Sequence, residues 1–170
     1  AKINFRTLSP NVEEFTQSDV KSPYALVVKN ACIKADAVIN QLKDKEIIIS
    51  ADTIVCLEEK IYGKPNSLQH AKMMIKELVG KSHNIVTGVC LKNKLKQKTF
   101  FECTKVYLSQ IGDDYIDCYL KNFDPTDKAG GYGVQDWFGI TNVEKFEGCF
   151  YNAMGLPVNR IFRELEQFVV

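Results

Sequence analysis

A carboxylate interrupts the apolar residues 47–56, where Asp52 lies between Ala51 and Thr53. Burial of an unpaired carboxylate in such a segment would cost several kcal/mol. We therefore expect Asp52 to have a cation, a metal ion or a cleft beside it. Partial burial would also raise the pKa of this carboxyl group, which suits a general base. A solvent-facing aspartate at a strand end is the simpler alternative, and the apolar residues on both sides argue against it.

Two lysines are candidates for the cation that Asp52 needs. Lys64 lies between Gly63 and Pro65, just past a predicted hairpin that would return it towards the strand of Asp52. Lys34 borders the apolar stripe of a predicted helix instead of lying opposite it. For each lysine taken alone, an ordinary exposed side chain remains the competing interpretation.

A glycine-rich segment, "DKAGGYGVQ" (127–135), is the third candidate element. Its glycines permit close backbone approach, and exposed N–H groups in such a loop can bind an anion. Lys128 adds positive charge, and Gln135 offers both a donor and an acceptor for a nucleobase edge. A flexible turn explains the glycines equally well. Together, however, a carboxylate, several lysines and a glycine loop fit water attack on a phosphate, assisted by Mg²⁺ bound to a carboxylate.

Length and composition indicate a globular protein with one domain, residues 1–170. Hydrophobic residues make up 45% and charged residues 25% of the chain, which allows a substantial core. The net charge of +1 gives no general reason to expect binding to nucleic acid. No segment has the roughly 20 apolar residues of a membrane span, and no signal peptide opens the printed chain. We expect a cytoplasmic protein without a membrane partner.

The six cysteines are scattered along the chain and form no C-x-x-C pair. Zinc sites require clustered ligands, and disulfide-stabilised domains are usually smaller and richer in cysteine. We therefore expect free thiols in a reducing compartment. The two histidines, His70 and His83, are too few and too far apart in the sequence to indicate a metal site.

Hydrophobic periodicity and turn residues predict alternating helices and strands. The predicted helices are 23–43, 67–79, 113–122 and 158–168, and the predicted strands are 46–56, 60–62, 83–91 and 98–108. A loop is predicted for 123–137. Helices interleaved with strands, some of them in hairpins, favour an α/β domain with a mixed, twisted sheet and flanking helices.

Five segments, taken together, resemble the Maf family of nucleoside-triphosphate pyrophosphatases, the house-cleaning enzymes of nucleotide metabolism. They are "SADTIVCLEEKIYGKP", "AKMMIKELVGKSHNIVTGV", "TKVYL", "DPTDKAGGYGVQ" and "GCFYNAMGLPVNRI". They occur in the family's order with its approximate spacing, from about Pro10 to the end of the chain. The resemblance implies a Maf/ITPase-like fold with two lobes around a cleft, and a homodimer is expected from the resemblance alone.

The reaction that the resemblance implies is hydrolysis of a nucleoside triphosphate to the monophosphate and pyrophosphate. Asp52 corresponds to the proton acceptor and to a ligand of a divalent metal ion, Mg²⁺ or Mn²⁺. Lys34 and Lys64 correspond to phosphate-binding lysines, and Lys128 would add charge beside them. Glu14 falls where the family has an acidic residue suited to metal binding, although Glu13 is adjacent.

Substrate choice is the remaining implication of the resemblance. The segment "DKAGGYGVQ" resembles the branch that acts on dTTP and UTP, and Thr53 and Gln135 match positions associated with substrate choice. Gln135 can bond a uracil or thymine carbonyl and ring N–H together. His83 and Thr87 also match family positions, and there we expect structural roles.

One departure from the family concerns the N-terminus. Members normally open with a strand that ends in Ser-x-Ser-Pro-Arg-Arg, and this motif does not occur in the printed sequence. Ser9-Pro10 does not replace it, because no arginine follows, and Arg6 stands in a different context. We expect the family's N-terminal strand to be absent from these residues and a sheet edge to be exposed. The alternative function is therefore a catalytically impaired nucleotide-binding or septum-regulating protein.

Overall fold

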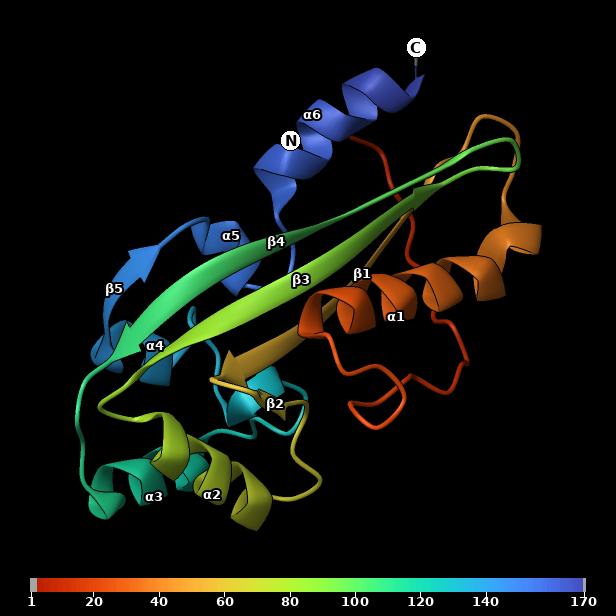
Figure 1. The fold of residues 1–170 in the computed structure, drawn as a ribbon. Helices are drawn as coiled ribbons and strands as arrows, with labels where there is room; N and C mark the ends of the chain where they lie inside the picture. Colours follow the sequence, from red (N-terminus) through yellow and green to blue (C-terminus); the bar gives the residue numbers. More distant parts are fainter. Residues whose placement is uncertain (1–2, 170) are drawn as a thin grey trace.

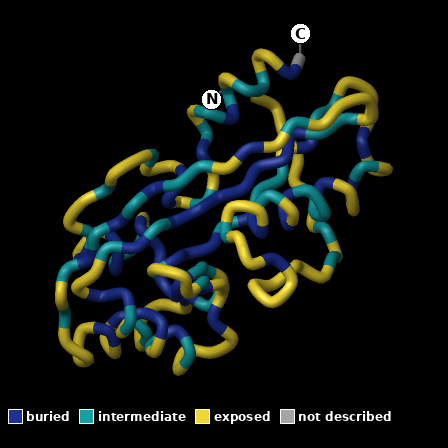
Figure 2. Tube along the Cα trace, in the orientation of Figure 1, coloured by how far each residue is buried: buried dark blue, intermediate teal, exposed yellow. Residues whose placement is uncertain are grey.

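A twisted five-stranded sheet forms the centre of the protein, with strand order β2-β1-β3-β4-β5. Figure 1 shows the computed structural model, which describes residues 3–169. The strands are β1 (Ile48–Leu57), β2 (Lys60–Tyr62), β3 (Ser82–Lys92), β4 (Gln97–Leu108) and β5 (Val143–Glu147). β3 and β4 form the long central hairpin, and β3 is buried along nearly its whole length (Figure 2).

The α/β class is confirmed, but the strand directions are not mixed. All strand pairings among residues 3–169 are antiparallel. The β1–β2 and β3–β4 pairings follow from the short connections Glu58–Glu59 and 93–96, which can join only antiparallel neighbours. β5 was not predicted, because "VEKFE" is a short and mostly exposed segment with little periodicity.

β2 is short and pairs only with the end of β1. Its register places Tyr62 opposite Val55 and Lys60 opposite Leu57. The turn that joins the two strands has Glu58 in a left-handed conformation with φ 54°. β1 pairs with β3 from Ile48 to Cys56, and β2 pairs only with Val55 to Leu57, so β2 does not cover the other edge of β1 at Asp52 and Thr53.

Helix α1 (Pro23–Val38) covers one face of the sheet. The Ser22 hydroxyl accepts a hydrogen bond from the N–H of Ala25, and Pro23 is the first helical residue, as the sequence predicts. The α-helix stops at Val38 and continues as the 3₁₀ turn η1 (Ile39–Gln41), short of the predicted end at residue 43. Val38, Ile39 and Asn40 are weak helix formers, which explains the earlier stop.

The other helices lie mainly on the opposite face. They are α2 (Leu68–Leu78), α3 (Asp113–Asn122), η2 (Ala129–Gly131), α4 (Trp137–Asn142), α5 (Phe150–Ala153) and α6 (Val158–Val169). α2 and α3 gather at one end of the sheet, and α6 lies across the hairpin from α1 (Figure 1). The predicted loop 123–137 contains only the short η2 before α4 begins. α4 and α5 were not predicted, because helices of 6 and 4 residues are too short to show a periodic pattern.

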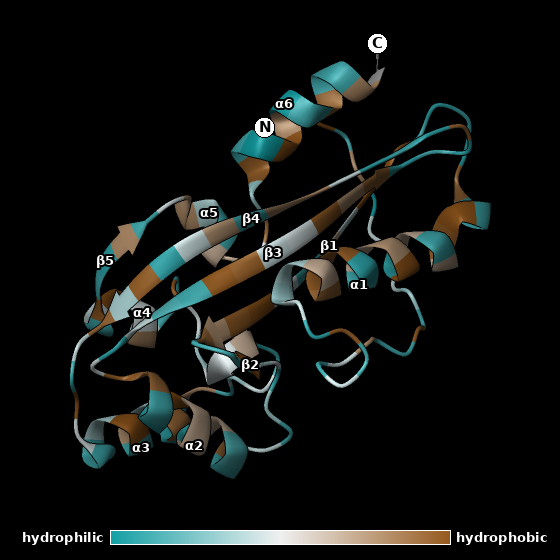
Figure 3. Cartoon of the chain, in the orientation of Figure 1, coloured by the Kyte–Doolittle hydropathy of each residue, from teal (hydrophilic) through white to brown (hydrophobic). Residues whose placement is uncertain are grey.

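Successive side chains of β1 point to opposite faces of the sheet and therefore enter two different parts of the core. Ile48 and Ile54 pack under α1, whereas Val55 packs with α2, α3 and the η2 loop on the other face. A separate cluster joins Val89 and Phe100 to α6. Figure 3 shows the apolar bands that run along the strands between these helices.

The six cysteines are free thiols, as expected. Among residues 3–169, no helix combines the length and the apolar composition that a bilayer crossing would require.

Candidate active site

Asp52 lies on the α1 face of β1 and has the partners that its burial demands. Only 8% of the residue is exposed. Nζ of Lys34 lies 2.5 Å from Oδ1 of Asp52, and the Asn30 amide nitrogen donates to Oδ2 at 3.2 Å. Asn30 and Lys34 stand four residues apart on α1, so one face of the helix presents both donors to the carboxylate. The structure thus selects Lys34 as the cation that accompanies Asp52.

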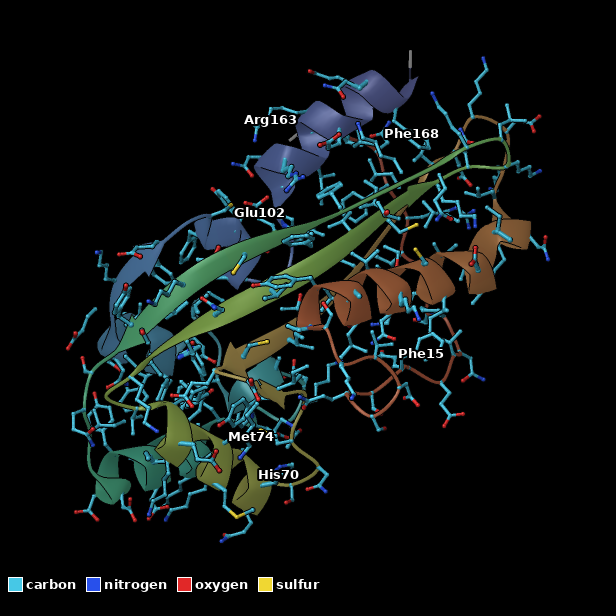
Figure 4. The ribbon with its side chains drawn as sticks, in the orientation of Figure 1. Phe15, His70, Met74, Glu102, Arg163 and Phe168 are labelled. Atoms are coloured by element: carbon cyan, nitrogen blue, oxygen red, sulfur yellow. The ribbon has the colours of Figure 1, made fainter. Side chains whose placement is uncertain are left out.

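Glu14 joins the same cluster from the segment that precedes α1. Its Oε1 lies 2.8 Å from Nζ of Lys34, whose side chain is 17% exposed. The neighbouring Phe15 is fixed by Asn30, which accepts from the Phe15 N–H at 2.8 Å and donates to its carbonyl at 3.1 Å. Figure 4 shows Phe15 beside α1, in the segment that passes below the helix. Asn30 therefore positions both the segment that carries Glu14 and the strand that carries Asp52.

Asn30 was not predicted as a site residue. It is 2% exposed and bonds both Asp52 and the backbone of Phe15. The available signal was its position one helical turn before Lys34, on the same side of a predicted amphipathic helix. A buried amide at that position requires polar partners, so a hydrogen bond between Asn30 and another polar residue could have been expected.

Burial and charge act in opposite directions on this cluster. Burial raises the pKa of Asp52, and the hydrogen bond and charge of Lys34 oppose that rise without cancelling it. For Lys34, burial lowers the pKa, and the two carboxylates of Asp52 and Glu14 outweigh it, so the pKa of Lys34 is raised. Asp52 is consequently a stronger base than an ordinary aspartate, and Lys34 remains a cation.

An open hollow of about 410 Å³ adjoins the cluster. Its lining is polar apart from Phe15 and consists of Glu13, Glu14, Phe15, Thr16 and Asp19. Because Glu14 borders the hollow and also contacts Lys34, solvent and ligands can approach the buried Asp52–Lys34 pair from this side.

The donor set is compatible with a divalent cation. Asp52 and Glu14 each contact Nζ of Lys34 through one carboxylate oxygen, so the two carboxylates lie close together around this lysine. Mg²⁺ commonly uses one or two protein carboxylates and completes its shell with water and substrate phosphate. No group of three or more acidic, histidine or cysteine residues suited to a metal occurs within residues 3–169. Any metal here would therefore depend on the substrate for further ligands.

The two remaining lysines come from segments that are bonded to each other. The backbone N–H of Gly130 donates to the carbonyl oxygen of Gly63 at 3.0 Å. This bond ties the Lys128 loop to the Gly63–Pro65 turn that carries the exposed Lys64. Lys128 is ion-paired with its neighbour Asp127 at 2.7 Å. Lys34 therefore contacts Asp52 directly, whereas Lys64 and Lys128 lie on the turn and the loop that the Gly130–Gly63 bond joins.

Gln135 is exposed at the end of the same loop, directly before α4. The adjacent Asp136 caps α4 by accepting from the N–H groups of Phe138 and Gly139, which fixes the end of the loop. The loop is anchored at its centre by Tyr132, whose hydroxyl lies 2.6 Å from Nε2 of the buried His83 in β3.

Thr53 follows Asp52 directly, and its side chain lies on the opposite face of the sheet. Its hydroxyl is 2.9 Å from that of Thr87, the residue opposite it in β3, and donates to the carbonyl of Gly155 at 3.3 Å. Thr87 is fully buried, as expected for a structural role. A ligand that contacts both Asp52 and Thr53 must therefore reach both faces at the margin of β1.

The chain is similar to known proteins over nearly its whole length. A family model described as Maf-like protein matches residues 1–168. A dTTP/UTP pyrophosphatase of Phocaeicola vulgatus is 40% identical over 166 residues, which are 98% of this chain and 85% of that protein. A dTTP/UTP pyrophosphatase of Cytophaga hutchinsonii is 37% identical over 171 residues, with coverage of 98% and 76%. A protein of the same name from Bacteroides fragilis is 44% identical over 134 residues, with coverage of 79% and 69%.

Proposed function

The chain belongs to the Maf-like protein family, and from this premise we propose that it is a nucleoside-triphosphate pyrophosphatase acting on dTTP and UTP. The reaction is hydrolysis of the bond between the α and β phosphates, which yields a nucleoside monophosphate and pyrophosphate. Relatives that are 40% and 37% identical are named dTTP/UTP pyrophosphatases. The single observation that carries the mechanism is the buried Asp52 carboxylate held between Lys34 and Asn30.

In this proposal Asp52 is the general base. A water molecule attacks the α-phosphorus while Asp52 takes its proton, and pyrophosphate leaves in line with the attacking oxygen. The raised pKa of Asp52 makes proton transfer from water easier than it would be to an exposed aspartate. The Asn30 amide keeps the carboxylate oriented throughout the step.

Positive charge for the transferring phosphates comes from lysines on two segments. Lys34 is already beside Asp52, and Lys64 and Lys128 reach the triphosphate from the joined turn and loop. Lysine serves here as a compact charge that stabilises the developing negative charge on the leaving pyrophosphate. Asp52 and Glu14 would hold Mg²⁺ or Mn²⁺, which neutralises phosphate charge and polarises the phosphoryl oxygen.

Base selection is assigned to Thr53 and Gln135. Gln135 is exposed at the end of the loop, where its amide can bond a pyrimidine carbonyl and ring N–H. Thr53 presents a hydroxyl on the face opposite Asp52, so the base and the reacting phosphate lie on different sides of β1. Six free thiols fit a reducing compartment, and we include cytoplasmic localisation in the proposal.

Product analysis in ¹⁸O-labelled water tests this proposal. With dTTP or UTP and Mg²⁺, we expect nucleoside monophosphate and pyrophosphate as products, with the label in the monophosphate. Nucleoside diphosphate and orthophosphate would show cleavage of the bond between the β and γ phosphates and would contradict the proposal. Nucleotide binding without any product would favour the alternative of a non-catalytic nucleotide-binding protein.

A further inference from the structure

The backbone of helix α1 lies directly against the backbone of strand β3 at Gly88. A Cβ atom added to Gly88 would lie 2.3 Å from the carbonyl carbon of Val27, 2.4 Å from its oxygen and 2.5 Å from the nitrogen of Val28. Cβ atoms in proteins essentially never come within 3.0 Å of such atoms. The three atoms belong to one planar peptide unit, so no change of side-chain rotamer could make room.

Gly88 is needed for space and not for its backbone conformation. It lies inside β3 and is not one of the glycines with positive φ. The strand backbone at this residue would therefore accept alanine without strain. Any effect of Gly88→Ala on α1 comes from the added methyl group alone.

The close approach of α1 is next to the carboxylate of the candidate active site. The register of β1 and β3 places Gly88 directly opposite Asp52, and residues opposite each other share one face of the sheet. On α1, Asn30 and Lys34 follow Val27 by three and seven positions, so all three lie on one side of the helix. The distance between α1 and β3 at Gly88 therefore sets how near Asn30 and Lys34 come to Asp52.

Asn30 depends on this distance more than Lys34 does. The bond from its amide nitrogen to Oδ2 of Asp52 is 3.2 Å, at the long end of the hydrogen-bond range. Two further bonds to the Phe15 backbone restrict the amide. The long and flexible side chain of Lys34 can follow Asp52 if α1 moves, whereas the short side chain of Asn30 cannot.

We propose that Gly88 is a positioning residue for the general base. Because it has no side chain, α1 lies close enough to β3 for Asn30 to orient the Asp52 carboxylate. A methyl group at Gly88 must increase the 2.3 Å distance to at least 3.0 Å, and it thereby takes Asn30 out of hydrogen-bonding range of Asp52. This inference rests on the proposed function, because that function makes Asp52 the base.

Steady-state hydrolysis of UTP with Mg²⁺ by wild-type protein and Gly88→Ala tests the inference. We expect kcat to fall by about 10–100-fold, the range for a catalytic group displaced by about 1 Å. The KM for UTP should stay within about threefold of wild type, since Lys34 can follow and Lys64 and Lys128 come from other segments.

Val86→Ala is the control for lost stability. Val86 lies two residues before Gly88 on the same face of β3 and packs with Val27. The substitution removes apolar atoms under α1 and inserts none. It should lower stability in urea and leave kcat within about twofold of wild type.

Asn30→Ala tests whether Gly88 acts through the asparagine. Alone it should lower kcat about as much as Gly88→Ala does, and adding Gly88→Ala to it should cost no more than about a further twofold. Ala31→Val is a second variant, for the case that Gly88→Ala does not fold. Ala31 is fully buried against Cys90, and the larger side chain should push α1 away and lower kcat by about threefold or more.

Each outcome decides a separate point. Wild-type kcat in folded Gly88→Ala, or in Ala31→Val if only that variant folds, would overturn the inference. Full multiplication of the losses in Gly88→Ala and Asn30→Ala would overturn the route through Asn30. Absence of pyrophosphate release by the wild-type protein would contradict the proposed function alone. The crystal structure of Gly88→Ala then tests the inference by itself, since an unchanged distance between Asn30 and Asp52 would refute it.

Discussion

The backbone N–H of Gly130 donates to the carbonyl oxygen of Gly63 at 3.0 Å, and this bond joins the two segments that carry Lys64 and Lys128. Gly130 has φ +74°, and a Cβ atom there would lie 3.0 Å from Cγ2 of Val55. The loop therefore depends on glycine at this residue for both conformation and space. Gly63 has no such restriction, because nothing lies within 4 Å of its added Cβ.

Gly130→Ala should accordingly destabilise the protein, whereas Gly63→Ala should not. A left-handed alanine costs about 1–2 kcal/mol, and the contact with Val55 adds to that. Urea unfolding at neutral pH measures both changes in the free energy of unfolding. Equal stability of the Gly130→Ala and wild-type proteins would show that the loop is not held as described.

Removal of Lys34 should expose the cost of an unpaired carboxylate. We expect Lys34→Met to lower the free energy of unfolding by about 3–5 kcal/mol, because Asp52 loses its cation while remaining buried. The double variant Lys34→Met with Asp52→Asn should recover part of that loss. Lys60→Met is the matched control, since the Lys60–Glu77 pair is exposed and should contribute less than about 1 kcal/mol. Additive effects of the two substitutions at Lys34 and Asp52 would refute the coupling.

His83 should make the protein less stable in acid. Burial lowers the pKa of His83 to about 4, from an ordinary value of 6.5. The only hydrogen-bond partner of its side chain within residues 3–169 is the Tyr132 hydroxyl, whose own pKa burial raises. The unfolded chain therefore binds a proton more readily, so stability is greatest above pH 6.5 and falls as the pH drops towards 4.

The size of this fall is about 3 kcal/mol from His83 alone. The free energy of unfolding at several pH values between 4 and 7.5 measures it. His83→Gln should flatten the curve over this range, whereas His70→Gln, at the other and more exposed histidine, should leave it unchanged. A wild-type slope that persists in His83→Gln would assign the effect to other groups.

Glu14 and its neighbour Glu13 should differ in their effect on metal dependence. Glu14 contacts Lys34 beside Asp52, whereas Glu13 only lines the adjoining hollow. We expect Glu14→Gln to raise the Mg²⁺ concentration for half-maximal activity by about tenfold, the usual range for loss of a metal-supporting carboxylate. Glu13→Gln should leave it unchanged. A Mg²⁺ titration that gives the same midpoint for both variants would remove Glu14 from the metal site.

The sequence predicts the buried Asp52 and its need for a cation, because a carboxylate buried within an apolar strand is costly unless it is paired. It does not predict which lysine meets it, since Lys34 and Lys64 depend on how α1 and the hairpin pack on β1. Helix α3 was predicted with its observed bounds because its sequence pattern is local, with Asp113 and Asp114 in the first turn and Lys121 in the last. β5 and the α5 segment are held by long-range contacts, such as those of Thr104 with Cys149, and no local pattern reveals these.

The opposite placement of Asp52 and Thr53 follows directly from strand alternation, once both are known to lie within one strand. The hydrogen bond between Asn152 and Thr104 could not be foreseen in the same way. The two residues are 48 residues apart in the sequence, and their hydrogen bond depends on the fold of the whole C-terminal part.

The rate of pyrophosphate release from dTTP and UTP by wild-type protein and Asp52→Asn tests the central claim most directly. Asparagine keeps the size and the hydrogen-bonding shape of the side chain but cannot accept the proton of water at neutral pH. We predict that kcat falls by about 10²–10⁴-fold, the usual contribution of a general base, while the protein remains folded. A folded Asp52→Asn protein with wild-type kcat would contradict the assignment of Asp52 as the base.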